Sequence, residues 1–127
     1  MKKTIIISAI ALGFAFHTSN ATTSIQTSKP SSFAKTKVSV SPFCISIVKG
    51  DLEMVNKLIQ LGADVNEASN GMTPAMYAAK YNRVDILELL VKNGAKLKKR
   101  SENGLNAMDY AKRSNAKDAL MYLKKIS

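Results

Sequence analysis

The chain repeats itself at a spacing of 32 to 33 residues, and this repetition constrains its fold more than any other feature. Ser41-Pro42-Phe43 recurs as Thr73-Pro74-Ala75 and, more loosely, as Asn106-Ala107-Met108. Gly62-Ala63 recurs as Gly94-Ala95. Asn70-Gly71 recurs as Asn103-Gly104. A unit of this length is too small to bury its own apolar face, so such units are stable only when they stack on one another. The sequence therefore predicts a stacked repeat array, an architecture that generally serves as a binding surface.

Each unit has the sequence signals of two helices joined by a tight turn. Thr73 can cap a helix with its hydroxyl, and Pro74 suits the first helical position, where a backbone N–H would have no partner. The apolar residues of the segment 84–91 form one broad stripe of a second helix. Asp85 lies in the first turn of this helix, and Gly94 suits the left-handed conformation at its C-terminal end. The unit is therefore predicted to be a helix, a turn, a second helix and a turn-rich connection.

The repeated motifs resemble the ankyrin repeat. The strongest matches to the usual sequence of that family are Gly62-Ala63-Asp64-Val65-Asn66, Gly71-Met72-Thr73-Pro74 and Ala78-Ala79. The resemblance covers about residues 39–126 and implies an all-α fold. This fold would be an ankyrin-repeat solenoid of about three helix-turn-helix repeats joined by turn or hairpin fingers, at about residues 41–72, 73–105 and 106–127.

The sequence departs from the family pattern at the turns and at both ends of the array. The position of the family's His is occupied by other residues: Cys44, Met76 and Asp109. The hydrogen bonds that this His makes are therefore missing or replaced. Because an array must end in units that tolerate water, the segment 103–126, with several lysines in its last helix, is expected to be a C-terminal cap. The segment 41–60, with Lys57 in place of a usual Leu, is expected to be an N-terminal cap.

Residues 1–21 have the composition of a bacterial secretory signal peptide. Two lysines precede a short apolar run over 4–16, and small residues favour cleavage after Ala21. The run has 13 residues, whereas a helix needs about 20 to cross a bilayer, so a cleaved leader is favoured over an uncleaved membrane anchor. Residues 22–40 are rich in Ser and Thr and are expected to be a flexible linker before the repeat domain at 41–127. The mature protein is then expected to be periplasmic or secreted.

The sequence offers little for catalysis or for holding a cofactor. Its single histidine, His17, lies in the expected signal peptide, and no Gly-rich phosphate loop of the usual spacing is present. Asp64 and Asn66 lack the regular spacing of calcium ligands and are better explained by a hydrogen-bonded turn. Cys44, the only cysteine, is expected to be buried on a first helix, with an exposed redox thiol or an intermolecular disulfide as the alternatives. We therefore expect no enzyme, no cofactor and no metal site.

In the ankyrin family the first helices line a concave face, so stacking should align equivalent positions into rows. The rows are Ile45, Tyr77 and Tyr110, then Val48, Lys80 and Arg113, then Lys49, Tyr81 and Ser114. Tyrosine and arginine are frequent interface anchors. The candidate partner-binding residues are Ile45, Tyr77, Lys80, Tyr81, Tyr110 and Arg113, together with Lys98, Lys99 and Arg100 on a predicted finger. The alternative for each tyrosine is packing between neighbouring units.

Charge is spread unevenly over the repeats. Residues 41–95 carry five basic and six acidic side chains, whereas residues 96–127 carry nine basic and three acidic ones. The basic end favours an acidic protein, an anionic envelope surface or a polyanion as the partner, and a solvated cap is the alternative.

Together these features predict an exported, non-catalytic protein–protein interaction module that presents its concave surface to a protein partner in the bacterial envelope. We expect a monomer, without stable membrane insertion after signal cleavage and without a nucleic-acid target. Two other functions remain open: a secreted effector or inhibitor that acts on a foreign protein, and a polyanion-binding envelope protein.

Overall fold

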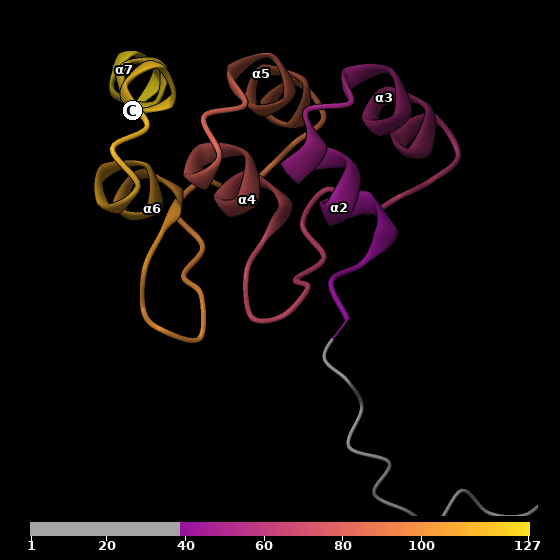
Figure 1. The fold of residues 1–127 in the computed structure, drawn as a ribbon, viewed down its shortest axis with the longest axis horizontal. Coiled ribbons are helices and arrows are strands. Elements are labelled where there is room, and N and C mark those ends of the chain that lie inside the picture. Colours follow the sequence, from indigo (N-terminus) through magenta and orange to yellow (C-terminus); the bar gives the residue numbers. More distant parts are fainter. Residues whose placement is uncertain (1–38) are drawn as a thin grey trace, which may run out of the picture. The chain divides into compact units, whose positions relative to one another are not determined.

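The structure, a computed structural model, describes residues 39–127, so the expected signal peptide and all but the end of the expected linker lie outside the described residues. This part of the chain forms six helices: α2 (Pro42–Lys49), α3 (Leu52–Gln60), α4 (Pro74–Lys80), α5 (Val84–Lys92), α6 (Ala107–Arg113) and α7 (Lys117–Ile126). Helices α2, α4 and α6 form one layer, and α3, α5 and α7 form a second layer beside it (Figure 1). The predicted all-α array of helix-turn-helix units is confirmed.

The helices pair into a first unit (α2 and α3), a second unit (α4 and α5) and a third unit (α6 and α7). Two connections, the first finger (61–73) and the second finger (93–106), project on the side of the first layer (Figure 1). An isolated bridge between Ser69 and Met72 closes the tip of the first finger, and residues 39–127 contain no strand. None of the helices in this range is long and apolar enough to cross a bilayer.

Each first helix begins at a side chain that caps it. Ser41, Thr73 and Asn106 each accept a hydrogen bond from the backbone N–H three residues further along. In the second unit Met76 Sδ accepts in return from the Thr73 N–H at 3.3 Å, and in the third unit the Asp109 carboxylate accepts from the Asn106 N–H at 3.1 Å. In these two units the hydrogen bonds of the family's His are therefore replaced.

A single residue in the left-handed conformation reverses the chain between the two helices of every unit. This residue is Gly50 in the first unit (φ 80°), Asn82 in the second (φ 55°) and Asn115 in the third (φ 54°). Glycine adopts this conformation without strain, and asparagine tolerates it better than most residues do. The tight turn that the sequence predicts after each first helix thus has the same geometry in all three units.

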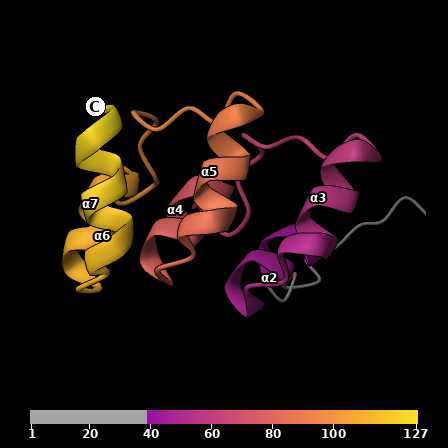
Figure 2. The same cartoon turned by 90° about the horizontal axis from the view of Figure 1, so that it is seen from above.

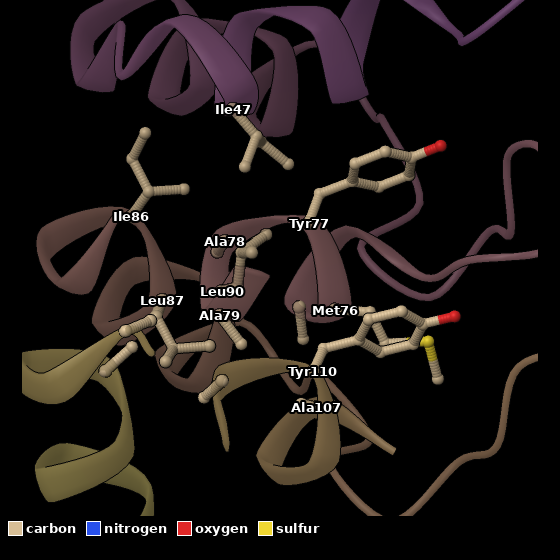
Figure 3. Close-up of a cluster of buried hydrophobic side chains, with 14 of the residues drawn as sticks. Ile47, Met76, Tyr77, Ala78, Ala79, Ile86, Leu87, Leu90, Ala107 and Tyr110 are labelled. Atoms are coloured by element: carbon tan, nitrogen blue, oxygen red, sulfur yellow. The ribbon is translucent and has the colours of Figure 1, made fainter. Parts of the chain in front are cut away.

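The core runs through the array between the layers and between the units. Ala75, Ala78 and Ala79 of α4 are each at most 1% exposed, so the small side chains allow α2 and α6 to approach on either side. Tyr77 and Ile86 extend from the second unit toward α2 (Figure 3). The central unit thus packs against both of its neighbours.

Arg83 ties the second unit to the first. Its Nε and Nη2 atoms donate to the Val48 carbonyl at 3.1 and 2.8 Å, one of the carbonyls that the end of α2 leaves without a helical partner. The guanidinium group lies over Gly50, where an added Cβ would come within 3.0 Å of the guanidinium carbon.

Asn82 ties the second unit to the third. Its Oδ1 atom accepts from the Ala119 N–H at 2.9 Å, and its Nδ2 atom donates to the Asp118 carboxylate at 3.0 Å. The N-cap position of α7 is Ala116, whose methyl group cannot accept a hydrogen bond. A residue of the preceding unit therefore caps α7.

The two ends of the array differ in how well they match the expected caps. Lys117, Lys124 and Lys125 are exposed on α7, as expected for a C-terminal cap. At the other end Lys57 is exposed, but Ile45 and Met54 are also 39% and 42% exposed. Lys57 occupies the position of Leu89, which lies beside α3 in the second unit. The N-terminal end therefore combines the lysine of the expected cap with exposed apolar side chains.

Candidate functional site

Two of the predicted partner-binding residues, Tyr77 and Tyr110, are buried between units. They are only 5% and 8% exposed. The Tyr77 hydroxyl donates to the Ser69 carbonyl at 3.0 Å, and the Tyr110 hydroxyl donates to Ser101 Oγ at 3.1 Å. Each ring thus packs inside the array while its hydroxyl holds the finger that precedes its helix. The structure corrects the prediction for these two residues, because neither ring is available to a partner.

Other predicted residues of the first helices reach the surface at their C-terminal ends. Tyr81 is 42% exposed, Arg113 is exposed and Lys80 is half-buried. The Lys80 ammonium nitrogen lies 5.6 Å from the centre of the Tyr81 ring, which is within range of a cation–π contact. With the exposed Lys49 of α2, these residues belong to two adjacent rows of equivalent positions: Lys80 and Arg113 in one, and Lys49 and Tyr81 in the other. We call Lys49, Lys80, Tyr81 and Arg113 the basic strip.

Ile45 has a different position from the other exposed candidates. It is 39% exposed, and it occupies in the first unit the position that Tyr77 and Tyr110 occupy in the next two. Those two residues are covered by the preceding unit, and among residues 39–127 no unit precedes the first. Ile45 therefore belongs to the end of the array and not to the basic strip.

The three basic candidates of the second finger are all exposed, but two of them also make structural contacts. Lys99 Nζ donates to the Asn66 carbonyl of the first finger at 3.2 Å. Arg100 Nη1 donates to the Gly104 carbonyl at 2.6 Å within its own finger. Lys98 lies at the rim of a shallow hollow beside α6 and α7. The finger thus displays positive charge on a backbone that these contacts hold in place.

Asn66 joins the two fingers, a role that the sequence did not reveal. Its Nδ2 atom donates to the Gly94 carbonyl at 3.0 Å, and its Oδ1 atom accepts from the Lys96 N–H at 2.7 Å. The Glu102 N–H also donates to the Gly71 carbonyl of the first finger at 3.3 Å. A turn-forming role was expected for Asn66, but its partners lie about one repeat away and no local signal marks them.

A groove also lies between the second helices α3 and α5. These two helices lie next to each other (Figure 2), in the layer away from the fingers (Figure 1). Its lining combines two leucines with three carboxylates, one lysine and one asparagine: Leu52, Glu53, Asn56, Asp85, Glu88, Leu89 and Lys92. The groove is therefore acidic, whereas the basic strip and the second finger are positive. The sequence reasoning did not identify this groove, because its two walls are separated by a whole repeat.

The described residues offer no obvious reactive centre. Within residues 39–127 no group of three or more His, Cys, Asp or Glu side chains could hold a metal ion. Cys44 is fully buried, as predicted, and this burial raises the pKa of its thiol above the ordinary value. A raised pKa keeps the thiol protonated and poorly nucleophilic at neutral pH.

Comparisons with known proteins agree with this architecture. The family model described as "Ankyrin repeats (3 copies)" matches residues 42–126, so the chain belongs to the ankyrin repeat family. Ankyrin repeats generally mediate protein–protein interactions and are typically non-catalytic.

Several large eukaryotic proteins contain similar segments. The chain is 33% identical over 82 residues to human Ankyrin repeat and SOCS box protein 11, which covers 64% of this chain and 25% of that protein. It is 39% identical over 61 residues to mouse 2-5A-dependent ribonuclease, a match that covers 46% of this chain and 8% of that protein. It is 37% identical over 62 residues to the rice potassium channel AKT1, a match that covers 48% of this chain and 7% of that protein. The chain thus spans a quarter or less of the length of these relatives.

Proposed function

We propose that this chain is an exported, non-catalytic protein-binding module whose basic strip and second finger contact an acidic segment of a protein partner. The observation that carries the proposal is the basic strip at the C-terminal ends of three successive first helices, in which Lys49, Tyr81 and Arg113 are exposed and Lys80 is half-buried. The family supports a protein as the partner, because ankyrin repeats generally bind proteins. The charge supports an acidic partner, because every ionisable group of the strip other than the tyrosine is cationic.

The strip has the physical properties of a pre-organised interface. Tyr81 offers a large ring and a hydroxyl, and Lys80 lies over the ring instead of extending freely into solvent. The backbone beneath the strip is fixed by the helix caps and by the hydrogen bonds of Arg83 and Asn82 between units. Binding would therefore cost little conformational entropy on this side of the interface.

The proposed location rests on the sequence of residues 1–21. Their positive start, short apolar run and small residues before Ala21 support export to the periplasm or beyond. The partner would then be a protein of the bacterial envelope. The alternative is a secreted effector that acts on a foreign protein. Recovery of the protein from culture medium, and not from the periplasm, would favour this alternative.

Affinity capture from envelope extract tests the proposal. The bait is compared with a Lys80→Ala/Arg113→Ala variant, which removes two charges from the strip, and with a Lys124→Ala/Lys125→Ala variant, which removes two charges from α7. Each variant is first shown by circular dichroism to be folded. We expect one protein to be enriched by the unchanged chain and by the α7 variant but not by the strip variant.

Two other outcomes of the capture would contradict the proposal. Equal loss in both double variants, together with elution by moderate salt, would indicate a polyanion-binding protein that responds only to total charge. Equal enrichment in all three baits would show that the strip is not the binding surface.

A further inference from the structure

The groove between α3 and α5 offers apolar and acidic side chains together. Its two leucines remain partly open to solvent: Leu52 is 41% exposed and Leu89 is half-buried. Three of the six carboxylates of residues 41–95 also line it, with a single lysine, which leaves a net charge of −2. The volume of the groove is about 640 Å³, whereas a water molecule occupies about 30 Å³ of the liquid. The groove therefore has room for several side chains of a partner.

The helix ends explain two of these carboxylates but not the third. Glu53 and Asp85 lie in the first turns of their helices, where a negative charge is favourable. Glu88 lies in the middle of α5, beyond the first turn to which this effect is confined. The equivalent positions in the first and third units are Asn56 and Met121. Glu88 is therefore a charge that neither the helix dipole nor the repeat pattern explains.

Asp85 lacks the hydrogen-bond donor that its equivalent in the third unit has. There the Asp118 carboxylate accepts from the side-chain amide of Asn82 at 3.0 Å. At the junction of the first and second units Gly50 occupies the position of Asn82, and glycine has no amide side chain to donate. Since Asp85 is also exposed, its carboxylate is open to a donor from another molecule.

We propose that this groove binds a basic amphipathic helix of a protein partner. The Lys or Arg side chains of that helix would contact the carboxylates, and its apolar side chains would pack on Leu52 and Leu89. Along α5 the lining residues are those at positions 85, 88, 89 and 92, which share one face of the helix, so the groove follows the helix axis. An amphipathic helix fits such a groove through anchors at the same spacing, and the net charge of the lining selects a cationic one.

This inference is independent of the proposed function, because the basic strip lies on the first helices and attracts the opposite charge. Other occupants of the groove are less favourable. A second copy of this chain would bring the same positive net charge, +10 in the full sequence, so the two copies repel each other. An anionic surface is repelled by the carboxylates. No group of three or more His, Cys, Asp or Glu side chains within residues 39–127 could hold a metal ion.

Fluorescence anisotropy with labelled model peptides tests the groove. The probe is an amphipathic helix of Leu and Lys, and its matched control has Glu in place of every Lys. Glu53→Gln/Glu88→Gln removes two charges from the groove, Leu52→Ser removes apolar area, and Glu67→Gln/Glu102→Gln removes two exposed charges from the fingers. We expect the dissociation constant of the Lys peptide to rise at least about 10-fold in the first two variants and less than about 2-fold in the third.

Several results would overturn the proposal. These are no binding of the Lys peptide, equal binding of the Glu peptide, and equal weakening in the two double variants, which would indicate attraction to total charge alone. Unchanged binding in Leu52→Ser would place the peptide outside the groove. Dimerisation of the unchanged chain in sedimentation equilibrium, abolished in Glu53→Gln/Glu88→Gln, would assign the groove to a second copy. The substituted side chains are exposed or half-buried, so the variants are expected to fold, and circular dichroism checks this.

Discussion

At the scale of single residues, the side chains that most resemble interface anchors serve to hold the array together. The Tyr77 ring is buried and its hydroxyl is bonded to the Ser69 carbonyl, whereas Tyr81, four residues later, is 42% exposed. A helix places residues four positions apart on similar faces, so the difference arises from what lies beyond the helix. The neighbouring unit covers one ring and leaves the other open.

Substitutions of these two tyrosines should therefore have different effects on stability. Tyr77→Phe removes one of the two hydrogen bonds that the Ser69 carbonyl accepts, the other coming from the Met72 N–H, and should lower the free energy of unfolding by about 1 kcal/mol. Tyr77→Ala also opens a cavity and should cost about 3 to 5 kcal/mol. Tyr81→Ala should change stability by less than about 1 kcal/mol. Urea unfolding followed by circular dichroism measures all three, and equal effects of the two alanine variants would contradict this assignment.

The buried thiol of Cys44 gives the protein a sensitivity to alkaline pH. Burial raises its pKa in the folded chain, so the unfolded chain loses this proton at a lower pH than the folded chain does. Stability should therefore be constant below the ordinary thiol pKa and fall as the pH rises above it. Burial also raises the pKa of Tyr77 and Tyr122, and these groups act in the same direction at higher pH.

Urea midpoints measured over an alkaline pH series test this expectation. Cys44→Ala should remove the earliest part of the decline, and alkylation of the thiol should be slow in the native chain and fast in urea. Rapid alkylation of the native protein would show that Cys44 is accessible.

At the scale of elements, most of the helices are capped by side chains that lie outside them. The three first helices are capped by the residue just before them, a local arrangement. In contrast, α7 is capped by Asn82, 37 residues before Ala119. The same Asn82 also adopts the left-handed conformation that the turn requires, so it has two separable roles.

Glycine substitutions can separate the two roles of Asn82. Asn82→Gly keeps the left-handed turn but removes the cap of α7, and it should lower stability by about 1 kcal/mol. Asn115→Gly is the matched control, because Asn115 has nearly the same φ (54° against 55°) and does not cap a later helix within the described chain. Its effect should stay within about 0.5 kcal/mol of zero. Thermal unfolding compares the two, and equal losses would show that only the turn matters.

The difference between local and distant contacts also explains what the sequence could predict. The caps at Thr73 and Asn106, the second helix from Val84 and the left-handed Gly94 follow from neighbours within a few residues, and the structure contains them. The bond from Arg83 to Val48 spans 35 residues and depends on how one unit sits on the next. The burial of Tyr77 depends on the same stacking, and periodicity alone does not give the direction of a side chain.

At the scale of the whole repeat region, the contacts across both junctions couple the units, so we expect the units to unfold together. The second unit packs against both neighbours, and Arg83 and Asn82 bond across both junctions. An array of nearest-neighbour contacts unfolds cooperatively when its junctions are strong and its single units are weak. The region should then behave as one thermodynamic unit despite its repeats.

This coupling can be measured with probes at opposite ends of the array. Helix content by circular dichroism and alkylation of Cys44 in the first unit should give the same urea midpoint. Leu123→Ala in α7, where the side chain is 1% exposed, should lower both midpoints by an amount that corresponds to about 2 to 5 kcal/mol. If only the helix signal shifted while Cys44 kept its protection, the third unit would be unfolding alone.

The contrast between the two end faces also sets the direction in which the protein could be lengthened. A new repeat joined before Ser41 would meet Ile45 and Met54, which are the kinds of side chain that internal junctions already use. A new repeat joined after Ser127 would meet Asp109 and Lys112, which occupy the positions of the buried Cys44 and Ile47 of the first unit, and would need compensating substitutions. Engineering and gene duplication should therefore add repeats more readily at the beginning of this array than at its end.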